Sequence, residues 1–281
     1  MKKVAVIILL LGGLCGSLGS QEAPSKTVMI DANHSLETAV PEVNMVAITK
    51  VLTGFSFDVK REILTEDLLN QYDVVMLVQP YEILEDSEID ALIHFVQKGG
   101  GLIMCGEHDV GWNDSSRSTY NKLGTTFGII FSSNAIDDPT DKAGCYCTPI
   151  IHNFAEHPLA EGISKITVYK PCSLRISGNA EAVARGDDDT HTVGVEKVEG
   201  EDVIVVAVSE FQKGRIVAVG SHTVFDDSFI NQPDNLDFVE NCFQWVSEQA
   251  TPQGGSLDVV IAIAAVAGIL MLIVVLKKRK G

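Results

Sequence analysis

The stretch that decides the fold is DVVMLVQPYEILEDSEIDALIHFVQKGGGLIMC, residues 73–105. It opens with a near-continuous apolar run, Asp73–Val78, which is typical of a strand covered on both faces of a sheet. Residues 87–98 then carry apolar side chains at helical spacing. Three glycines at 99–101 end this helix, and a second apolar run, 102–105, forms the next strand. A strand, a helix and a strand with short joints predict two parallel strands joined by a crossover helix.

The same alternation continues on both sides of this unit. Further helices are expected at 43–52, 65–69, 120–127 and 235–248, the second of them capped by Thr65. Residues 132–149 are polar and predict a loop. Further strands are expected at 27–31, 57–59, 129–131, 166–169, 172–176, 181–185, 191–195, 203–208 and 214–220. The pattern predicts an α/β fold, with a parallel sheet wrapped by helices on both faces and a β-rich extension.

A longer apolar stretch lies near the carboxyl end of the chain. Residues 257–276 contain one charge, Asp258, and are long enough to cross a bilayer core as a helix. The basic tail 277–281 follows at once, and such clusters stay on the cytoplasmic side. We therefore expect a single transmembrane helix at 257–276, anchored in the lipid bilayer and joined to the body by a linker at 251–256.

The amino end of the chain predicts that the domain between the two hydrophobic segments is exported across the membrane. Lys2 and Lys3 precede an apolar run, and small residues continue to Ser20, which is the pattern of a secretory signal peptide over 1–20. The alternative is an uncleaved signal anchor. Both interpretations place a single extracytoplasmic domain, 26–250, on the outside of the cell membrane.

The charge of the body narrows the classes of partner. Without the two hydrophobic ends and the basic tail, the chain holds 15 Lys and Arg and 37 Asp and Glu, a net charge of −22. Such an acidic surface argues against a nucleic-acid partner and against docking on an anionic membrane surface. It suits a solvated domain that faces the medium.

Five cysteines follow the signal segment, and an odd number excludes a fully paired disulfide framework within one chain. Cys105 and Cys242 lie in apolar strand and helix patterns, so we expect buried thiols. Cys145 or Cys147 is expected to pair with Cys172 if the surroundings are oxidising.

Two loops carry clustered carboxylates, which are ligands for calcium. Asp137, Asp138 and Asp141 lie in the first loop, and 187–189 are all Asp in the second. Neither loop has the alternating spacing of an EF-hand, and a solvated acidic turn is the other interpretation. The CYC stretch at 145–147 with His152 offers two thiolates and one imidazole, which make an incomplete metal site.

Three stretches occur together in the order found in a known superfamily. They are DANH at 31–34, HPLAEGI at 157–163, and GRIVAVGS at 214–221 followed by Asp234 and Asn235. Residues 27–247 thereby resemble the class I glutamine amidotransferase-like superfamily. The resemblance is closer to its non-catalytic branch, which includes domains of gliding-motility transport proteins, of an intraflagellar-transport subunit, and of uncharacterised archaeal and bacterial membrane proteins. It implies a flavodoxin-like sheet and a binding or assembly role in a membrane transport or envelope complex.

Two departures from the catalytic members bear on activity. Those members carry a nucleophilic Cys on a Gly-x-Cys-x-Gly elbow and a late His-x-Glu pair. The nearest stretch here is MCGE at 104–107, which lacks the glycine before Cys105. His222 is followed by Thr and Val rather than by a Glu two residues on. We therefore expect no amidotransferase activity and assign no catalytic residue.

Ligands of open α/β sheets bind beyond the carboxyl ends of the strands. The polar residues that follow the predicted strand ends are our ligand-binding candidates: Asp31, His34, Gln79, Glu107, His108, Ser221, His222 and Asp226. Imidazoles with carboxylates suit a divalent metal, which would activate water. The other interpretation is that these side chains only cap loops. Trp112, in the loop after Glu107, is either a lid or a packed anchor.

The sequence thus favours a membrane-anchored extracytoplasmic binding or assembly module with an amidotransferase-like fold and no catalytic triad. Its partners would be the lipid bilayer and a protein of a membrane complex, with no nucleic acid. The alternative is a metal-dependent hydrolase that uses the histidines and carboxylates at the strand ends. A divalent metal is the one cofactor that this alternative would need.

The topology can be tested on intact cells. Protease added outside is expected to remove the domain and leave a short membrane-bound stub, because the basic tail after 276 keeps the carboxyl end inside. Truncation before Leu257 is expected to release a soluble domain into the medium. A domain that the protease cannot reach until the cells are opened would contradict this orientation.

Overall fold

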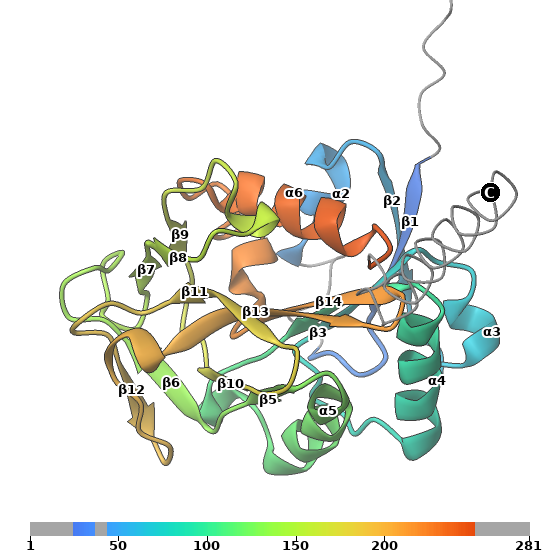
Figure 1. The fold of residues 1–281 in the computed structure, drawn as a ribbon, viewed down its shortest axis with the longest axis horizontal. Coiled ribbons are helices and arrows are strands. Elements are labelled where there is room, and N and C mark those ends of the chain that lie inside the picture. Colours follow the sequence, from blue (N-terminus) through green and yellow to red (C-terminus); the bar gives the residue numbers. More distant parts are fainter. Residues whose placement is uncertain (1–24, 37–43, 251–281) are drawn as a thin grey trace, which may run out of the picture.

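The structure, a computed structural model, describes residues 25–36 and 44–250. Its central parallel strands are β1 (Lys26–Asp31), β2 (Phe55–Lys60), β3 (Val74–Val78), β4 (Gly101–Cys105) and β14 (Gly214–Val219). They lie side by side in the order β2-β1-β3-β4-β14, each parallel to its neighbour (Figure 1). The carboxyl ends of these five strands therefore meet at one edge of the sheet.

The second half of the sheet is antiparallel. Its strands are β13 (Ile204–Phe211), β10 (Leu174–Ile176), β5 (Ile129–Phe131), β11 (Glu181–Arg185) and β8 (Asn153–Phe154). β13 continues the sheet from β14, β10 and β5 follow it, and β11 with β8 branches from β13. Two small sheets of the described residues stand beside it, β6 (Asn134–Asp137) with β12 (His191–Gly194) and β7 (Ile150–Ile151) with β9 (Ile166–Thr167). The result is a mixed α/β fold consistent with the flavodoxin-like class, with a β-rich extension.

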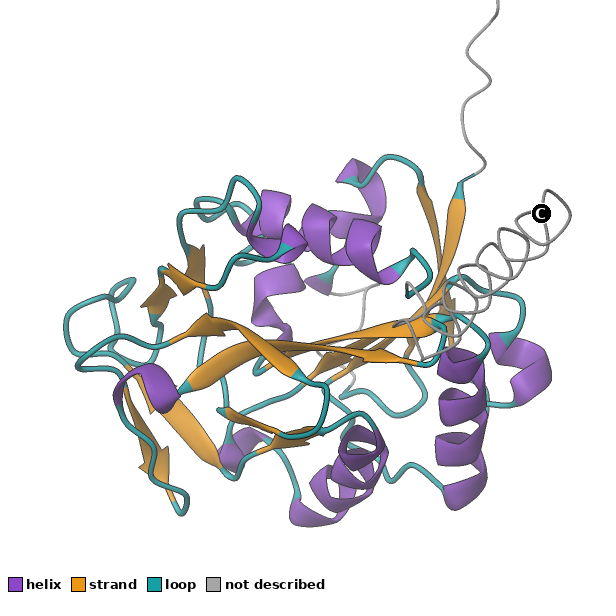
Figure 2. Cartoon of the chain, viewed as in Figure 1, coloured by secondary structure: helices purple, strands orange, loops and turns teal. Residues whose placement is uncertain are grey.

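Helices cover both faces of the parallel strands (Figures 1 and 2). α2 (Ile48–Val51) and α6 (Asn235–Val246) lie on one face, and α3 (Glu66–Leu69), α4 (Asp86–Gln97) and α5 (Asp114–Thr126) lie on the other. The alternation within β4 shows how the two layers form. Ile103 and Cys105 join the core under α6, whereas Leu102 and Met104 join the core against α4 and α5. Each fully buried aliphatic side chain of this kind contributes about 1.5–3 kcal/mol of transfer free energy.

Two glycines let the amino edge of the sheet approach the helices closely. A Cβ on Gly101 would lie 2.2 Å from the carbonyl oxygen of Val246 at the end of α6. A Cβ on Gly214 would lie 2.3 Å from the carbonyl oxygen of Val96 near the end of α4. Both neighbours are backbone atoms that cannot move aside cheaply, so only glycine fits at these two positions.

Most of the predicted elements are confirmed, and three are corrected. Residues 134–137, predicted as loop, form β6, because they pair with β12 from a distant part of the chain. The helix predicted at 120–127 begins earlier, at Asp114, because the side chain of Asn113 accepts a hydrogen bond from the amide of Ser116 and caps it. The helix predicted at 43–52 is only α2, Ile48–Val51, in the part of that range that the structure describes.

The cysteine pairing predicted from the sequence is wrong. Cys145 and Cys147 are bonded to each other, two residues apart, and Cys172 is a free buried thiol. This pairing also removes the proposed thiolate ligands beside His152. Cys105 and Cys242 are buried free thiols, as predicted.

The predicted signal segment 1–20, linker 251–256, transmembrane helix 257–276 and basic tail 277–281 lie outside the described residues. Within residues 25–36 and 44–250, no helix is long and apolar enough to cross a membrane.

Candidate functional site

The candidate site is built on the carboxyl edge of the parallel strands. β1 ends at Asp31, β3 ends just before Gln79, β4 ends two residues before Glu107, and β14 ends two residues before Ser221. The structure gathers five of the eight predicted residues into two largely buried groups, and the other three bond to the backbone of the turns. We refer to this region, the turns that follow β1, β3, β4 and β14, as the strand-end edge.

Glu107 is the centre of the first group. Its Oε1 accepts hydrogen bonds from the backbone amide of His108, at 2.9 Å, and from the His108 ring. Its Oε2 lies 3.4 Å from Nδ1 of His222, within ion-pair distance but without hydrogen-bond geometry. Burial raises the pKa of Glu107, but the two imidazoles outweigh burial and lower it to about 2. Glu107 is therefore a carboxylate throughout the neutral range, held between two imidazoles.

Asp31 and His34 form the second group with a residue that the sequence did not point to. Nδ1 of His34 lies 2.9 Å from Oδ2 of Asp31, and its Nε2 lies 3.2 Å from Oε2 of Glu88. All three residues are buried. Burial lowers the pKa of His34, but the hydrogen bonds and charges of Asp31 and Glu88 raise it further than burial lowers it. Glu88 also closes the capping box of α4 with Glu85, so this group ties the turn after β1 to the start of α4.

Of the remaining three candidates, Ser221 and Asp226 hold the shape of their own turns, and Gln79 joins the turn after β3 to the turn after β4. Gln79 has a φ of 42° and donates from Nε2 to the carbonyl of Gly111 at 3.1 Å. Ser221 accepts from the amide of Thr223 and caps the short 3₁₀ helix that contains His222. Asp226 accepts from the amides of Ser228 and Phe229. The loop-cap interpretation thus describes Ser221 and Asp226. Gln79, His34 and His222 make contacts between different elements, with Gly111, Glu88 and Glu107 respectively.

Cys105, in the stretch nearest to the elbow pattern named in the sequence resemblance, is enclosed. Cys105 is the last residue of β4, paired in register with Val78 of β3 and Val219 of β14. It is 0 % exposed, and burial raises the pKa of its thiol strongly. A thiol is a nucleophile only as the thiolate, so this position lacks the accessible, ionised sulfur that acyl transfer requires.

Trp112 is a packed residue rather than an exposed lid. It is 2 % exposed, and its ring lies edge-on to Tyr120 at 5.2 Å and to Phe131 at 5.7 Å between centroids. It closes the core beneath the turn after β4.

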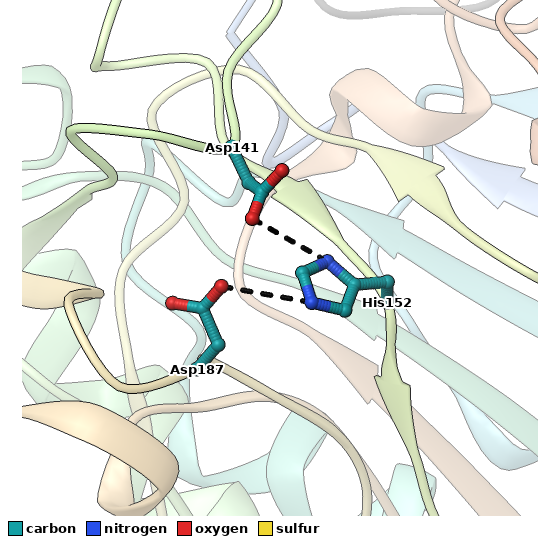
Figure 3. Close-up of side chains that lie close together, drawn as sticks. All are labelled: Asp141, His152 and Asp187. Carbon is teal, nitrogen blue, oxygen red and sulfur yellow. Dashed lines mark ion pairs between the residues drawn. The ribbon is translucent and has the colours of Figure 1, made fainter.

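A second polar constellation, which the sequence presented as separate pieces, lies in the β-rich extension. Figure 3 shows Asp141 and Asp187 directed toward the ring of His152 from two different loops. Nδ1 of His152 is 3.9 Å from Oδ2 of Asp141, and its Nε2 is 3.6 Å from Oδ2 of Asp187. Asp138, Asp187 and Asp189 form an adjoining group whose carboxylate oxygens lie within 4.8 Å of one another.

This constellation opens on a hollow of about 580 Å³ lined by Thr140, His152, Asn153, Asp187, Asp188, Asp189 and Glu201. Carboxylates and an imidazole in this arrangement match the ligands of a divalent cation. Asp138, however, already accepts hydrogen bonds from Thr140, Asp141 and Thr190. The side chains of Asp141 and His152 are 47 % and 45 % exposed, so water solvates them directly.

The comparisons with known proteins identify the fold. No protein-family model matches the chain, and no curated protein matches it either. Among solved structures, it is similar to the N-terminal domain of IFT52, with a TM-score of 0.66 and 14 % identity over 79 % of this chain and 97 % of that one. It is also similar to a putative ThuA-like protein from Bacteroides uniformis, with a TM-score of 0.52 and 17 % identity over 82 % and 95 %.

A cytoplasmic protein from Salmonella typhimurium aligns as well, with a TM-score of 0.55 and 14 % identity over 79 % of this chain and 99 % of that one. The IFT52 domain and the ThuA-like protein have class I glutamine amidotransferase-like folds. This chain therefore has the fold that the sequence resemblance implied. At these identities the likeness concerns the fold alone.

The buried group around His34 predicts a specific pH dependence of stability. The pKa of His34 is raised in the folded protein. The contribution of His34 to the free energy of unfolding is therefore complete below its pKa in the unfolded chain, about 6.5, and is lost as the pH rises through its pKa in the folded protein. His34→Gln is expected to lower the free energy of unfolding by on the order of 2 kcal/mol at pH 6 and by less at higher pH. Urea unfolding of both proteins between pH 5.5 and 9 measures this difference.

The matched control is His94→Gln, which removes an exposed imidazole that contacts Glu66 on the surface. This variant measures how the free energy of unfolding changes when a histidine in an exposed ion pair is lost. If the parent and His34→Gln lose stability in parallel across the whole range, the His34 group does not carry a buried charge.

Proposed function

We propose that this protein is a membrane-anchored, outward-facing binding or assembly module of the non-catalytic amidotransferase-like branch, and that it contacts its partner through the strand-end edge. The observation that carries this proposal is the enclosure of Cys105. The thiol points into the α6 core, in register between two neighbouring strands, and is fully buried. The fold is retained while its nucleophile position has become part of the core.

The late histidine supports the same proposal. In catalytic members of the superfamily the late His is followed by a Glu two residues on, whereas here that position is Val224, which is fully buried. His222, in the turn after β14, instead faces Glu107, which lies in the turn after β4. The imidazole is thus paired within the strand-end edge and makes no contact with Cys105 that would activate a nucleophile.

Exposed apolar side chains at this edge support a protein partner. Val110, in the turn after β4, is 88 % exposed, and Val195, after β12, is 84 % exposed. The two turns touch, since a Cβ on Gly194 would lie 2.7 Å from Oδ2 of Asp109. Tyr81, in the turn after β3, is 41 % exposed and accepts from Asn113 through its carbonyl. Apolar side chains beside buried polar ones are the composition expected of a binding surface.

The partner contact can be tested by site-specific cross-linking. A photo-reactive phenylalanine analogue at Val110, in the full-length protein in native membranes, is expected to give one discrete adduct of higher mass. The control position is Val51, 46 % exposed at the end of α2 and just before β2 starts, near the opposite edge of the sheet. Adducts of equal yield at both positions, or none at Val110, would refute the strand-end edge as the contact surface.

The alternative, a metal-dependent hydrolase, has one observation in its favour. Two imidazoles lie beside the carboxylate of Glu107. The ring of His108 makes a hydrogen bond with it, whereas Nδ1 of His222 makes no hydrogen bond with the described residues. A free imidazole nitrogen beside a carboxylate is a metal-ligand pair. A third ligand atom is not brought within 4.8 Å of this pair among the described residues.

Elemental analysis decides between the two functions. Purified full-length protein and His222→Gln are compared for zinc, manganese and calcium content and for hydrolysis of p-nitrophenyl acetate and phosphate. We expect neither stoichiometric metal nor activity that His222→Gln removes, because the pair lacks a third ligand. One bound ion per chain that is lost together with hydrolysis in His222→Gln would establish the hydrolase.

A further inference from the structure

Four buried polar side-chain atoms without a hydrogen-bond partner belong to the turns after β4, β5 and β14 and to the start of α5. Among the described residues these side-chain atoms are Nε1 of Trp112, Nη1 of Arg117, Oγ of Ser132 and Nδ1 of His222. Their residues are 2 %, 7 %, 1 % and 9 % exposed. All four belong to the turns after β4, β5 and β14 or to the first turns of α5, next to the strand-end edge. Buried polar atoms without partners are rare because each loses its hydration, so a group of them needs an explanation.

Arg117 has the largest demand for a partner. Its side chain is 9 % exposed, and its Nη2 pairs with Asp114, whose side chain is 90 % exposed. Its Nη1 has no partner among the described residues. An arginine cannot lose its proton in a protein, so a buried guanidinium with an open nitrogen is costly unless an acceptor reaches it.

Packing places Arg117 beside the end of β5. Asn121, one turn later in α5, donates to the carbonyl of Phe131 at 2.9 Å and accepts from its amide at 2.8 Å. α5 and β5 run in opposite directions on this face, since a Cβ on Gly124 would touch the carbonyl of Ile129. Arg117 therefore comes level with the residues just beyond Phe131, of which Ser132 is the first.

The same contacts connect this group to β4. The Phe131 ring packs on the Trp112 ring, and a Cβ on Gly106 would lie 2.5 Å from Phe131 and 3.0 Å from Sγ of Cys172. Burial raises the pKa of Cys172, the charge of Glu107 raises it further, and the charge of Arg117 lowers it. Gly106 directly precedes Glu107, so Phe131 and Cys172 pack against the start of the turn that carries Glu107.

The chemistry of the open atoms defines what they would bind. Guanidinium and indole nitrogens only donate hydrogen bonds, and a serine hydroxyl has a donor to offer. The complementary group is an acceptor-rich anion, and arginine matches carboxylates and phosphates particularly well. None of them makes a hydrogen bond with the carboxylate of Glu107, whose Oε1 accepts from His108 and whose Oε2 lies 3.4 Å from Nδ1 of His222.

We propose that Arg117, Ser132 and Trp112 form a binding site for an anionic oxygen group, a carboxylate or a phosphate, on the molecule that the strand-end edge recognises. This inference rests on the proposed function, because it names the chemical group by which the strand-end edge would recognise its partner. The site would bind the anion through Nη1 of Arg117, Oγ of Ser132 and Nε1 of Trp112. Asp114 holds the other side of the guanidinium and orients it.

The probes are inorganic phosphate and acetate, with chloride at matched ionic strength as the reference. Binding to purified full-length protein is measured by titration calorimetry and by the shift of the thermal unfolding midpoint. We expect saturable binding of one or both probes, and the stronger of the two identifies the source of the anionic group. Arg117→Gln is expected to weaken this binding by on the order of tenfold or more, since it removes the charged donor.

Two further variants keep the result interpretable. Arg175→Gln removes an arginine that is 58 % exposed on β10 and is expected to bind the probe as the parent does. Ser132→Ala retains the charge and is expected to weaken binding roughly threefold, which provides a test if Arg117→Gln does not fold. No saturable binding of either anion by the parent, or equal binding in the parent and both site variants, would overturn the proposal.

These results are separable from those on the partner contact. The anion titrations use the purified chain alone, whereas the cross-link at Val110 requires the partner in its membrane. A specific cross-link without anion binding would leave the assembly module intact and refute only the anionic group. Anion binding without a cross-link would leave the anion site and refute the strand-end edge as the surface that contacts a protein partner.

Discussion

The burial of both faces of the parallel strands governs the rest of this structure. Every residue of β3, β4 and β14 is buried, with side chains alternating between the α6 core and the α4–α5 core. Arg215, near the amino end of β14, is the one charged side chain within these strands, and it pairs with Glu210 and Glu248. The other polar residues collect where the strands end. At that edge they are still largely shielded from water, and a shielded carboxylate must find partners. Glu107 meets two imidazoles, and Asp31 meets His34, for this reason.

The same constraint explains how much of the fold the sequence predicts. A strand buried on both faces needs a continuous apolar run, and the runs at 73–78, 102–105 and 214–220 are of that kind. Parallel order then places the residues after them at one edge, which is why Glu107 and His222, over a hundred residues apart, were predicted as neighbours. The pattern did not reveal Glu88, because a Glu in the first turn of a helix is also what capping alone requires.

The parts that the sequence did not predict depend on contacts without a local pattern. β6 forms because β12 pairs with it, and nothing in 134–137 alone distinguishes a strand from a polar loop. The same pairing of distant segments brings Asp138 and Asp141 to Asp187, so that two acidic turns become one constellation with His152 between them. Arg117 lies in a polar helix segment, so its sequence context predicts an exposed side chain. It is buried because α5 packs along β5.

The position of Cys105 is the main support for the proposed binding role over an acyl-transfer role. A nucleophile has to leave the strand on a turn that lifts it above the sheet edge, which the glycines of an elbow permit. Here β4 stays paired through Cys105 with strands on both sides, and the pairing directs the thiol into the core. The amide of Gly106 still donates to the carbonyl of Val219 in β14 at 2.8 Å, so Glu107 is the first side chain beyond the paired strand. The groups at the edge are therefore a carboxylate, imidazoles and donors without hydrogen-bond partners among the described residues. Under the proposed function, such groups would hold a ligand by charge and hydrogen bonds, and Cys105 would take no part as a nucleophile because it is enclosed.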